Sequence, residues 1–400
     1  MKIAIIFDAK SKGGGGFFQS LNSSLLLNKL NNKKNKISFI TFDRTALSKL
    51  KIEGLDAILF KNTLLLKIFF HLKQINIFKF FFKFFKFKNS FSSFLKKNKF
   101  DFIVFLGPSW FIRVCDDHNF VSTIYDINFK LENYFPEYRS KNIFKDKDQI
   151  VSDTVNYGFK ILVDTKRSKR ELVEIYNCPE RKIVIQPFIP LLPTLQKKVD
   201  SANELKLIFN LGLKDKNFLF YPAQFWAHKN HKYIIDAVEI LNRKKNDIKI
   251  VFCGADKSNL YYIKETINKK KLNNSFFIFD FISDEEIIAL YKNCMALVMP
   301  TYVARSTLPL YEAFYFKKPI FYSKNILDED LEKLIIPVDL YNPEDLSNKI
   351  LELKSDINFG KEKILKASRY YNDNCHEEIF LKNYQNIFNE YEYLSERWKK

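Results

Sequence analysis

A lysine lies at the point where a buried strand gives way to a helix, in the segment FLFYPAQFWAHKNHKYIIDAVEIL from Phe218 to Leu241. The pattern predicts a strand, a sharp turn that carries Lys229, and an amphipathic helix that begins just after Asn230. Backbone N–H groups and the dipole at a helix N-terminus attract anions, and an ammonium group adds a point charge. The turn is therefore a candidate phosphate site. The alternative is a solvated lysine at the start of a helix.

A second anion site is predicted further along the chain, in MALVMPTYVARSTLPLYEAF. A strand there runs into a loop, and a helix is expected to open at Pro309, whose missing N–H suits a first helical turn. The loop would present the backbone N–H groups of Ser306, Thr307 and Leu308 to an anion. Glu312 follows one turn into the helix, where it is either a ligand-binding acid or a carboxylate that stabilises the helix dipole. Two helix N-termini aimed at anions, with one acid, predict a nucleotide diphosphate site.

The elements around these residues predict an α/β fold with two domains. Four hundred residues exceed what one core normally serves, and apolar runs alternate with helical patterns, as in parallel sheets covered by helices. The expected strands of the first half are KIAIIFD, KISFITFD, FDFIVFLG, FVSTIYDI, FKILVDT and KIVIQPF, and those of the second half are NFLFYPA, IKIVFCG, SFFIFDF, MALVMPT, PIFYS and IIPVDL. We expect an N-terminal Rossmann-like domain over 1–190, a linker over 191–206, a second Rossmann-like domain over 207–375, and a C-terminal helix over 376–400.

The order of these motifs resembles retaining GT-B glycosyltransferases. The HKNH turn, the Gly-ended strand IKIVFCG, the run ISDEEIIALYKNCMALVMPT and the pattern Leu-Pro-x-x-Glu-Ala are similar to family 4 (glycosyl transferases group 1), in particular its bacterial surface-polysaccharide members. The resemblance is dense from about Phe218 to Ile320. It implies two Rossmann-like domains facing a cleft, with the first as acceptor domain, the second binding the nucleotide-sugar, and C-terminal helices crossing back to the first.

The resemblance also implies a reaction and its partners. A hexose-type sugar would move, with retention, from a UDP-, GDP- or dTDP-sugar donor to a glycan or lipid-linked acceptor, in lipopolysaccharide O-antigen or capsule synthesis. Neither a cofactor nor a metal is expected. The rival interpretations are a catalytically inactive GT-B scaffold and a basic membrane- or nucleic-acid-binding protein, although no nucleic-acid-binding motif is present.

Residue roles follow from the same resemblance. Lys229 would stabilise the diphosphate leaving group, and Glu312 corresponds to the second glutamate of the family's E-x7-E pattern, which accepts hydrogen bonds from ribose. Ala304 replaces the first glutamate, which puts a carboxylate contact to the donor sugar in doubt. The full donor-binding set is expected to be Gln224, His228, Gly254, Arg305, Ser306, Thr307, Leu308 and Glu312, with Arg305 supplying the charge that an arginine near Gln224 often supplies in relatives.

Two features of the first half are candidates for the acceptor side of the site. A run of glycines follows the first strand and precedes a helix, so Gly14, Gly15 and Gly16 could let the backbone approach a ligand. The alternative is a flexible turn. Asp126 closes the strand FVSTIYD, where ligands bind in open sheets. It would position the acceptor hydroxyl or donor sugar as a second catalytic residue, or else cap the next loop.

Metal chemistry is not expected. The strings Asp146-Lys147-Asp148 and Asp328-Glu329-Asp330 lie in charged loop or helix contexts instead of ending an apolar strand. His228 and His231 lack the third ligand and the spacing of a zinc site, so they are expected to hydrogen-bond in the cleft or cap the helix.

The net charge and the composition of the chain indicate where in the cell the protein is expected. The net charge of +19 favours anionic partners, although an AT-rich genome also explains part of the lysine excess. The core INIFKFFFKFFKFK aligns Lys79, Lys83 and Lys86 on one helical face among phenylalanines, which predicts contact with an anionic membrane surface or, alternatively, a core helix covered by lysine stems. Scattered cysteines, with Cys253 and Cys294 expected to be buried thiols, and the lack of a signal peptide predict a cytoplasmic protein, peripheral on the inner face of the cytoplasmic membrane if the lysine face binds lipid.

Overall fold

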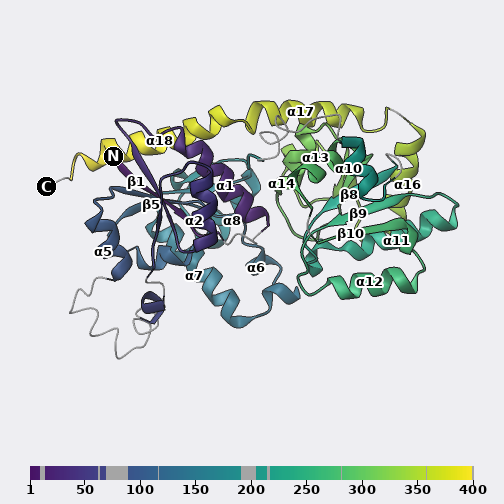
Figure 1. Ribbon diagram of the computed structural model, residues 1–400, viewed down its shortest axis with the longest axis horizontal. Coiled ribbons are helices and arrows are strands. Elements are labelled where there is room, and N and C mark those ends of the chain that lie inside the picture. Colours follow the sequence, from purple (N-terminus) through teal and green to yellow (C-terminus); the bar gives the residue numbers. More distant parts are fainter. Residues whose placement is uncertain are drawn as a thin grey trace. The chain divides into compact units, whose positions relative to one another are not determined.

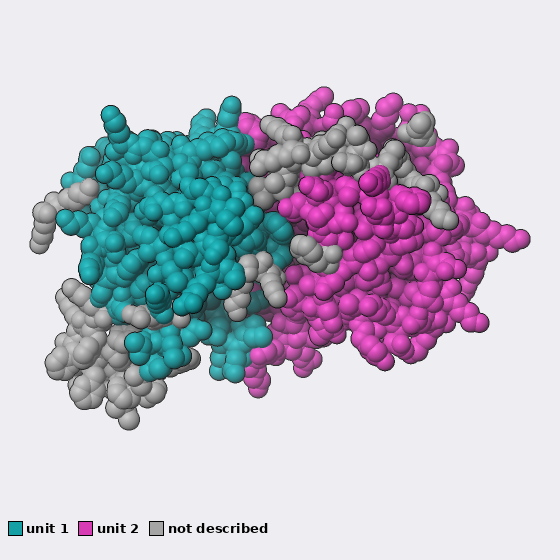
Figure 2. All heavy atoms as spheres, in the orientation of Figure 1, with its two compact units in different colours: residues 1–127, 142–187, 377–400 teal, residues 128–141, 188–376 magenta. Residues whose placement is uncertain are grey.

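The computed structural model describes residues 1–9, 14–61, 64–68, 89–115, 117–190, 204–213, 217–280, 282–356 and 358–398. They form two compact units (Figure 2). Unit 1 comprises Met1–Ile127, Asn142–Pro187 and Glu377–Lys400, and unit 2 comprises Asn128–Lys141 and Phe188–His376. The lysine face of Lys79, Lys83 and Lys86 lies outside the described residues, as do residues 191–203 of the expected linker.

Unit 1 is built on a parallel sheet with the strand order β3-β2-β1-β4-β5-β6-β7. Its strands are near-continuous apolar runs because both faces of a parallel sheet are covered by helices. Every strand expected in the first half is present, and the three-residue β3 is an addition that pairs with β2 at the sheet edge. The strands are β1 (Lys2–Phe7), β2 (Lys36–Thr41), β3 (Ala57–Leu59), β4 (Phe102–Phe105), β5 (Asn119–Thr123), β6 (Lys160–Val163) and β7 (Ile183–Ile185).

Several helices of unit 1 begin at polar residues that cap them, and the C-terminal helix belongs to the same unit. Asp43 and Asn89 accept backbone N–H groups at the starts of α2 and α5. The hydroxyl of Tyr391, on α18, donates to the carbonyl of Asp101 at 2.9 Å, so the expected return of the C-terminal helix to the first unit is observed. The helices are α1 (Gly15–Asn28), α2 (Arg44–Ile52), α5 (Ser90–Lys97), η1 (Trp110–Val114), α7 (Lys141–Tyr157), α8 (Lys166–Tyr176), η3 (Glu180–Lys182) and α18 (Glu377–Ser395).

Unit 2 is built on a second parallel sheet, with the order β10-β9-β8-β11-β12-β13. Its central strands β8 and β11 are buried except for Pro222 at the end of β8, which agrees with their apolar sequences. All strands expected in the second half are present, so the predicted α/β fold with two Rossmann-like halves is confirmed. The strands are β8 (Phe218–Pro222), β9 (Lys249–Cys253), β10 (Phe276–Phe279), β11 (Ala296–Met299), β12 (Ile320–Ser323) and β13 (Ile336–Val338).

Helices cover both faces of the second sheet. In Figure 1, α13, α14 and α17 lie on one side of the strands β8–β10, and α11 and α12 lie on the other. A capping box between Ser283 and Glu286 starts α13. The helices are α6 (Asn128–Leu131), η2 (Pro136–Tyr138), α10 (Glu204–Asn210), η5 (Ala227–Lys229), α11 (His231–Arg243), α12 (Leu260–Lys269), η6 (Asn273–Ser275), α13 (Asp284–Asn293), α14 (Leu308–Tyr315), α15 (Glu329–Glu332), α16 (Pro343–Ser355) and α17 (Lys361–Asn374).

Unit boundaries differ from the expected domains at residues 128–141 and, by one to three residues, at 188–190 and at His376. Residues 128–141 fall within the expected domain 1–190, yet they pack in unit 2. The physical reason is a set of aromatic and polar contacts, among them the ring of Phe135 against Tyr302 at 5.5 Å. No helix among the described residues is long and apolar enough to cross a membrane.

Candidate active site

The site of unit 2 lies where the order of its strands reverses direction. From β8 the chain adds β9 and β10 on one side, and it then returns to place β11 on the other side of β8. Strands β8 and β11 are parallel neighbours, so the loops that follow them emerge side by side. In open α/β sheets, the carboxyl ends of the strands at such a switch point form the usual ligand site.

The loop after β8 carries the candidate phosphate lysine. Lys229 ends the short helix η5, and Asn230 takes a left-handed conformation (φ 54°) immediately before α11, as the sequence predicts. The hydroxyl of Tyr221, on β8, donates to the carbonyl of Lys229 at 2.8 Å. This partly buried hydrogen bond joins the strand to the turn that precedes α11.

The loop after β11 is bonded to the same turn. The backbone N–H of Tyr302 donates to the carbonyl of His228 at 2.9 Å, and the hydroxyl of Thr301 donates to that carbonyl at 3.2 Å. Ser323, on the next strand β12, in turn donates its hydroxyl to the carbonyl of Thr301 at 2.6 Å. The two loops that the sequence assigned to anion binding are therefore in direct contact.

The helix after this loop begins one residue earlier than expected. Leu308 is its first residue, Pro309 occupies the first turn, and the hydroxyl of Thr307 accepts the N–H of Leu310 at 3.3 Å. Ser306 and Arg305 are buried in the loop. The hydroxyl oxygen of Thr307 thus caps the helix by accepting an N–H, and this bond does not use the hydroxyl proton.

Glu312 carries the most perturbed carboxyl group of this region. The residue is partly exposed on α14, but its carboxyl group is buried, and Oε2 accepts the hydroxyl of Tyr291 at 2.6 Å. Burial raises the pKa of Glu312 to about 7, against the opposing effect of that hydrogen bond. Because burial also keeps the pKa of Tyr291 well above its usual value, the tyrosine stays protonated and donates to Glu312.

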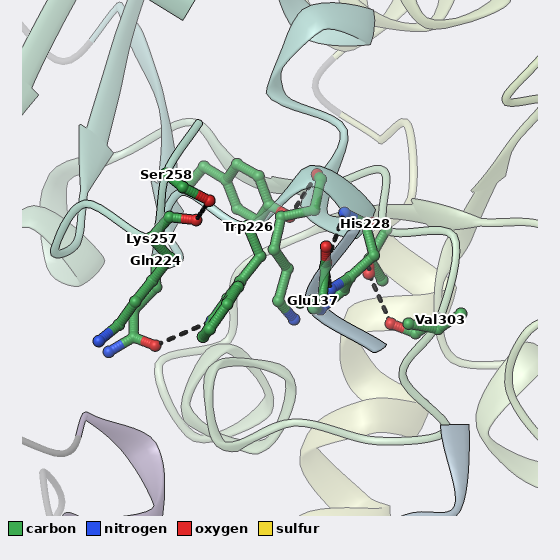
Figure 3. Close-up of polar contacts among 10 residues, drawn as sticks. Glu137, Gln224, Trp226, His228, Lys257, Ser258 and Val303 are labelled. Carbon is green, nitrogen blue, oxygen red and sulfur yellow. Dashed lines mark hydrogen bonds and ion pairs between the residues drawn. The ribbon is translucent and has the colours of Figure 1, made fainter. Parts of the chain in front are cut away.

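Gly254 has a packing role next to the site. It follows β9, and a Cβ at this position would lie 2.4 Å from the carbonyl oxygen of Ala223 and 2.7 Å from the N of Gln224. Only glycine therefore allows the loop after β8 to approach this closely. The side chain of Gln224 accepts the indole N–H of Trp226 at 3.1 Å, and the ammonium of Lys257 lies 5.7 Å from the indole centroid (Figure 3).

The two histidines of the HKNH turn have different surroundings, and neither caps α11. His231 is fully buried against the rings of Phe225 and Phe252, and burial lowers its pKa to about 3. His228 instead bonds to Glu137, which the sequence did not single out (Figure 3). Glu137 lies 91 residues away along the chain, and no local pattern connects the two.

The candidates of the first half all lie in unit 1. Gly14 (φ 65°) precedes α1, which starts at Gly15, so the glycines do stand at a helix start. This loop follows β1 at the corresponding reversal of the first sheet. Asp126 does not close a strand as expected, because β5 ends at Thr123, and Asp126 lies exposed in the loop beyond it.

Neither acidic string gathers a metal cluster. Asp146 and Asp148 lie on α7, bonded to Arg113 and to the hydroxyl of Tyr176, and Asp328 caps α15. In the part of the chain that the structure describes, no three His, Cys, Asp or Glu side chains are grouped to hold a metal ion. The cysteines are free thiols, and Cys253 is only partly buried, contrary to expectation.

Comparisons with known proteins find a family model that matches part of the chain and solved structures that share its fold. Residues 204–368 match the protein-family model for glycosyl transferases group 1. A glycosyltransferase from Rickettsia africae has a TM-score of 0.69 and 18% identity, covering 98% of each chain. HepE of Anabaena, in complex with UDP-glucose, has a TM-score of 0.74 and 13% identity, covering 98% of this chain and 100% of that chain.

A third similar structure is WaaG, a glycosyltransferase involved in lipopolysaccharide biosynthesis, with a TM-score of 0.68 and 13% identity over 96% of this chain and 99% of that chain. A sequence comparison with curated proteins finds no match. Two parallel-sheet, Rossmann-like units that align with these structures over nearly the whole chain establish the GT-B fold.

Proposed function

We propose that this chain, a glycosyltransferase by its matched domain and its GT-B fold, moves a hexose-type sugar from a nucleotide-sugar to a glycan or lipid-linked acceptor with retention and without a metal. The process we favour is synthesis of a lipopolysaccharide O-antigen or a capsule. An anionic membrane surface is the proposed location of the lipid-linked acceptor.

One observation carries the proposal. The turn with Lys229 and the loop that leads to Glu312 are joined through the carbonyl of His228, which accepts hydrogen bonds from Thr301 and Tyr302. An ammonium group suited to a diphosphate and a carboxylate suited to ribose hydroxyls are thus held on one framework. A nucleoside diphosphate combines these two chemical groups.

The proposed mechanism stabilises the leaving group. As the bond to the sugar breaks, negative charge develops on the diphosphate, where Lys229 and the N–H groups at the start of α14 act as preorganised donors. The oxygen of the acceptor hydroxyl bonds to the anomeric carbon as the diphosphate leaves, and a phosphate oxygen of the donor takes the hydroxyl proton. The acceptor itself is the attacking group and the phosphate is the base, so neither a protein nucleophile nor a protein base is assigned. Asp126 and the glycine loop of Gly14, Gly15 and Gly16 are proposed to contact the acceptor side.

Two similar proteins support the finer points of the proposal. The HepE structure contains UDP-glucose, which favours a uridine diphosphate sugar as the first donor to test. WaaG acts in lipopolysaccharide biosynthesis, which favours a surface glycan as product. Both proteins share only 13% sequence identity with this chain, so they serve to choose the substrates for experiment.

The second candidate is an inactive GT-B scaffold, and it is motivated by Ala304. This residue stands where the family pattern has its first glutamate, and its carbonyl accepts the hydroxyl of Tyr322 at 2.9 Å. A scaffold would bind a nucleotide-sugar without cleaving it. Slow hydrolysis of the donor in the absence of acceptor separates the two candidates.

The experiment is a thermal-shift panel of UDP-, GDP- and dTDP-sugars, followed by a hydrolysis assay with the best ligand. A ligand that binds only the folded state raises its apparent stability. Lys229→Ala should reduce donor cleavage by about 2–4 kcal/mol of transition-state stabilisation. The matched control is Lys232→Ala, since Lys232 is exposed on the next helix and pairs with Asp236. Equal loss in both variants, or no loss in either, removes Lys229 from the site.

A further inference from the structure

Residues 128–141 leave the fold of unit 1 to pack in unit 2. They connect β5 to α7, which are both mainly in unit 1, yet their short helices α6 and η2 belong to unit 2. The ring of Tyr138 stacks on His228 at a centroid distance of 5.8 Å, and that of Phe135 lies 6.1 Å from it, edge-on. Residues 128–141 therefore pack against one side of the turn that carries Lys229.

Glu137 makes the polar contact between this segment and His228. Its side chain is only 5% exposed. Oε1 accepts the backbone N–H of His228 at 3.1 Å and also bonds to the ring nitrogen Nδ1 of His228. Burial alone would raise the pKa of Glu137, but the hydrogen bonds from His228 lower it below its usual value. The buried carboxyl group is therefore ionised at neutral pH, where its partners offset the cost of desolvation.

The opposite side of the same turn is held by other elements. The carbonyl of His228 accepts from Thr301 and Tyr302, and the carbonyl of Lys229 accepts from Tyr221. The backbone of His228 is consequently gripped at both its N–H and its C=O. Lys229 follows directly, so the direction from which its side chain starts is fixed by these bonds.

We propose that Glu137 is a positioning residue for the turn that carries Lys229, the proposed ligand of the diphosphate. It holds both the backbone and the ring of His228, and it thereby orients the turn from which Lys229 reaches the phosphates. The inference rests on the proposed function, because it assigns Glu137 a role in the same donor site. Glu137 itself does not touch the donor, and its carboxylate is held by hydrogen bonds to His228 beside a site that must attract an anion.

If Glu137 has this positioning role, its loss affects binding of the phosphates and binding of the nucleoside differently. Glu312, the proposed ribose ligand, lies on α14 and takes its hydrogen bond from Tyr291 instead of from Glu137. Loss of the Glu137 carboxylate should therefore weaken contacts to phosphate and spare contacts to ribose and base. A residue that only stabilised the fold of unit 2 would weaken both equally.

The test uses isothermal titration of the full-length protein with three probes: pyrophosphate, UDP and uridine. Glu137→Gln keeps the shape of the side chain and removes its charge. It should weaken binding of pyrophosphate and of UDP about tenfold each, the size of loss expected when a binding group is slightly misplaced, and leave uridine unchanged. The control is Glu132→Gln, which removes another carboxylate of the same segment, one that bonds to Tyr134, and should bind all three probes as wild type does.

The outcomes distinguish this inference from the proposed function. If Lys229→Ala weakens pyrophosphate binding but Glu137→Gln does not, the inference on Glu137 is wrong and the site stands. If Lys229→Ala binds pyrophosphate as wild type does, the proposed site itself fails. A loss of equal size for uridine and UDP in Glu137→Gln assigns Glu137 a structural role and overturns the inference.

A folding defect is handled by a second variant. Thermal unfolding followed by circular dichroism identifies whether Glu137→Gln is folded. If it is not, Glu137→Asp keeps the charge and draws the carboxylate back by one methylene. That variant should weaken pyrophosphate binding with uridine unchanged, and wild-type affinity for pyrophosphate would refute the positioning role.

Discussion

The carboxyl group of Glu312 should make the protein less stable as pH rises. Its pKa is raised to about 7 from 4.5 because the group is buried, although the hydroxyl of Tyr291 opposes the shift. A group whose pKa is raised on folding stabilises the folded state. This contribution is complete at pH values below the pKa of the unfolded state, and it is lost as the pH rises through the pKa of the folded state. The window for this loss therefore runs from about pH 4.5 to about pH 7.

The size of the effect follows from the shift. Each pKa unit corresponds to about 1.4 kcal/mol, so ionised Glu312 costs about 3 kcal/mol of folding free energy above pH 8. Glu312→Gln cannot ionise, and its amide oxygen still accepts from Tyr291. The variant should match wild type at pH 4.5 and exceed it by about 3 kcal/mol at pH 8.5.

The assay is urea unfolding of both proteins at these two pH values, with Glu285→Gln as the control. Glu285 is exposed at the start of α13, so its replacement should give the same small difference at both pH values. A Glu312→Gln difference that does not change between pH 4.5 and pH 8.5 would refute the reasoning. So would a variant less stable than wild type at pH 8.5.

The stabilised variant should bind donor less well. Ribose hydroxyls donate to an ionised carboxylate more strongly than to an amide, and a hydrogen bond to a charged group contributes about 1.5–3 kcal/mol. Nucleotide-sugar affinity of wild type should accordingly increase from pH 6 to pH 8, while that of Glu312→Gln stays low and flat. Opposite pH trends of stability and affinity are the signature of an acid buried for function.

Three further outcomes are expected. Gly254→Ala should lose about 2–3 kcal/mol of stability, because its Cβ would meet the backbone of Ala223, whereas Gly16→Ala, with 3.9 Å of clearance, should lose much less in urea unfolding. EDTA should leave donor cleavage unchanged, and inhibition reversed by Mn²⁺ would reveal a metal site. The protein should sediment with vesicles of acidic lipid at low salt, and replacing Lys79, Lys83 and Lys86 with Gln should weaken this binding while donor hydrolysis persists; a triple variant that binds like wild type, or a wild type that does not bind, contradicts the membrane prediction.

Strands were predictable from the sequence because parallel sheets bury both faces of a strand. Runs such as KIAIIF and FLFYP carry that signal locally. The missed strand, Ala57–Leu59, is an edge strand whose three residues are only partly buried, so it lacks the buried apolar run of the other strands. The end of β5 was placed too late because Ile124 and Tyr125 continue the apolar run after pairing has stopped at Thr123.

The site was predictable only where it follows a strand directly. Lys229 and Glu312 stand at fixed offsets from β8 and from the start of α14, so local pattern finds them. The packing role of Gly254 could not be predicted, because the sequence shows a glycine but not the backbone of Ala223 against it. Glu137 was missed because its partner His228 is brought near by tertiary packing alone.

The placement of residues 128–141 has a consequence for exchanging parts between related enzymes. A hybrid made by joining two chains near residue 188 would take His228 and Lys229 from one parent and Glu137 from the other. The buried carboxylate would then face whatever side chain the second parent supplies in place of His228. Donor specificity should therefore be transferred only when residues 128–141 and residues 188–376 are both taken from the same parent. The two stretches form one unit although they are separate in the sequence.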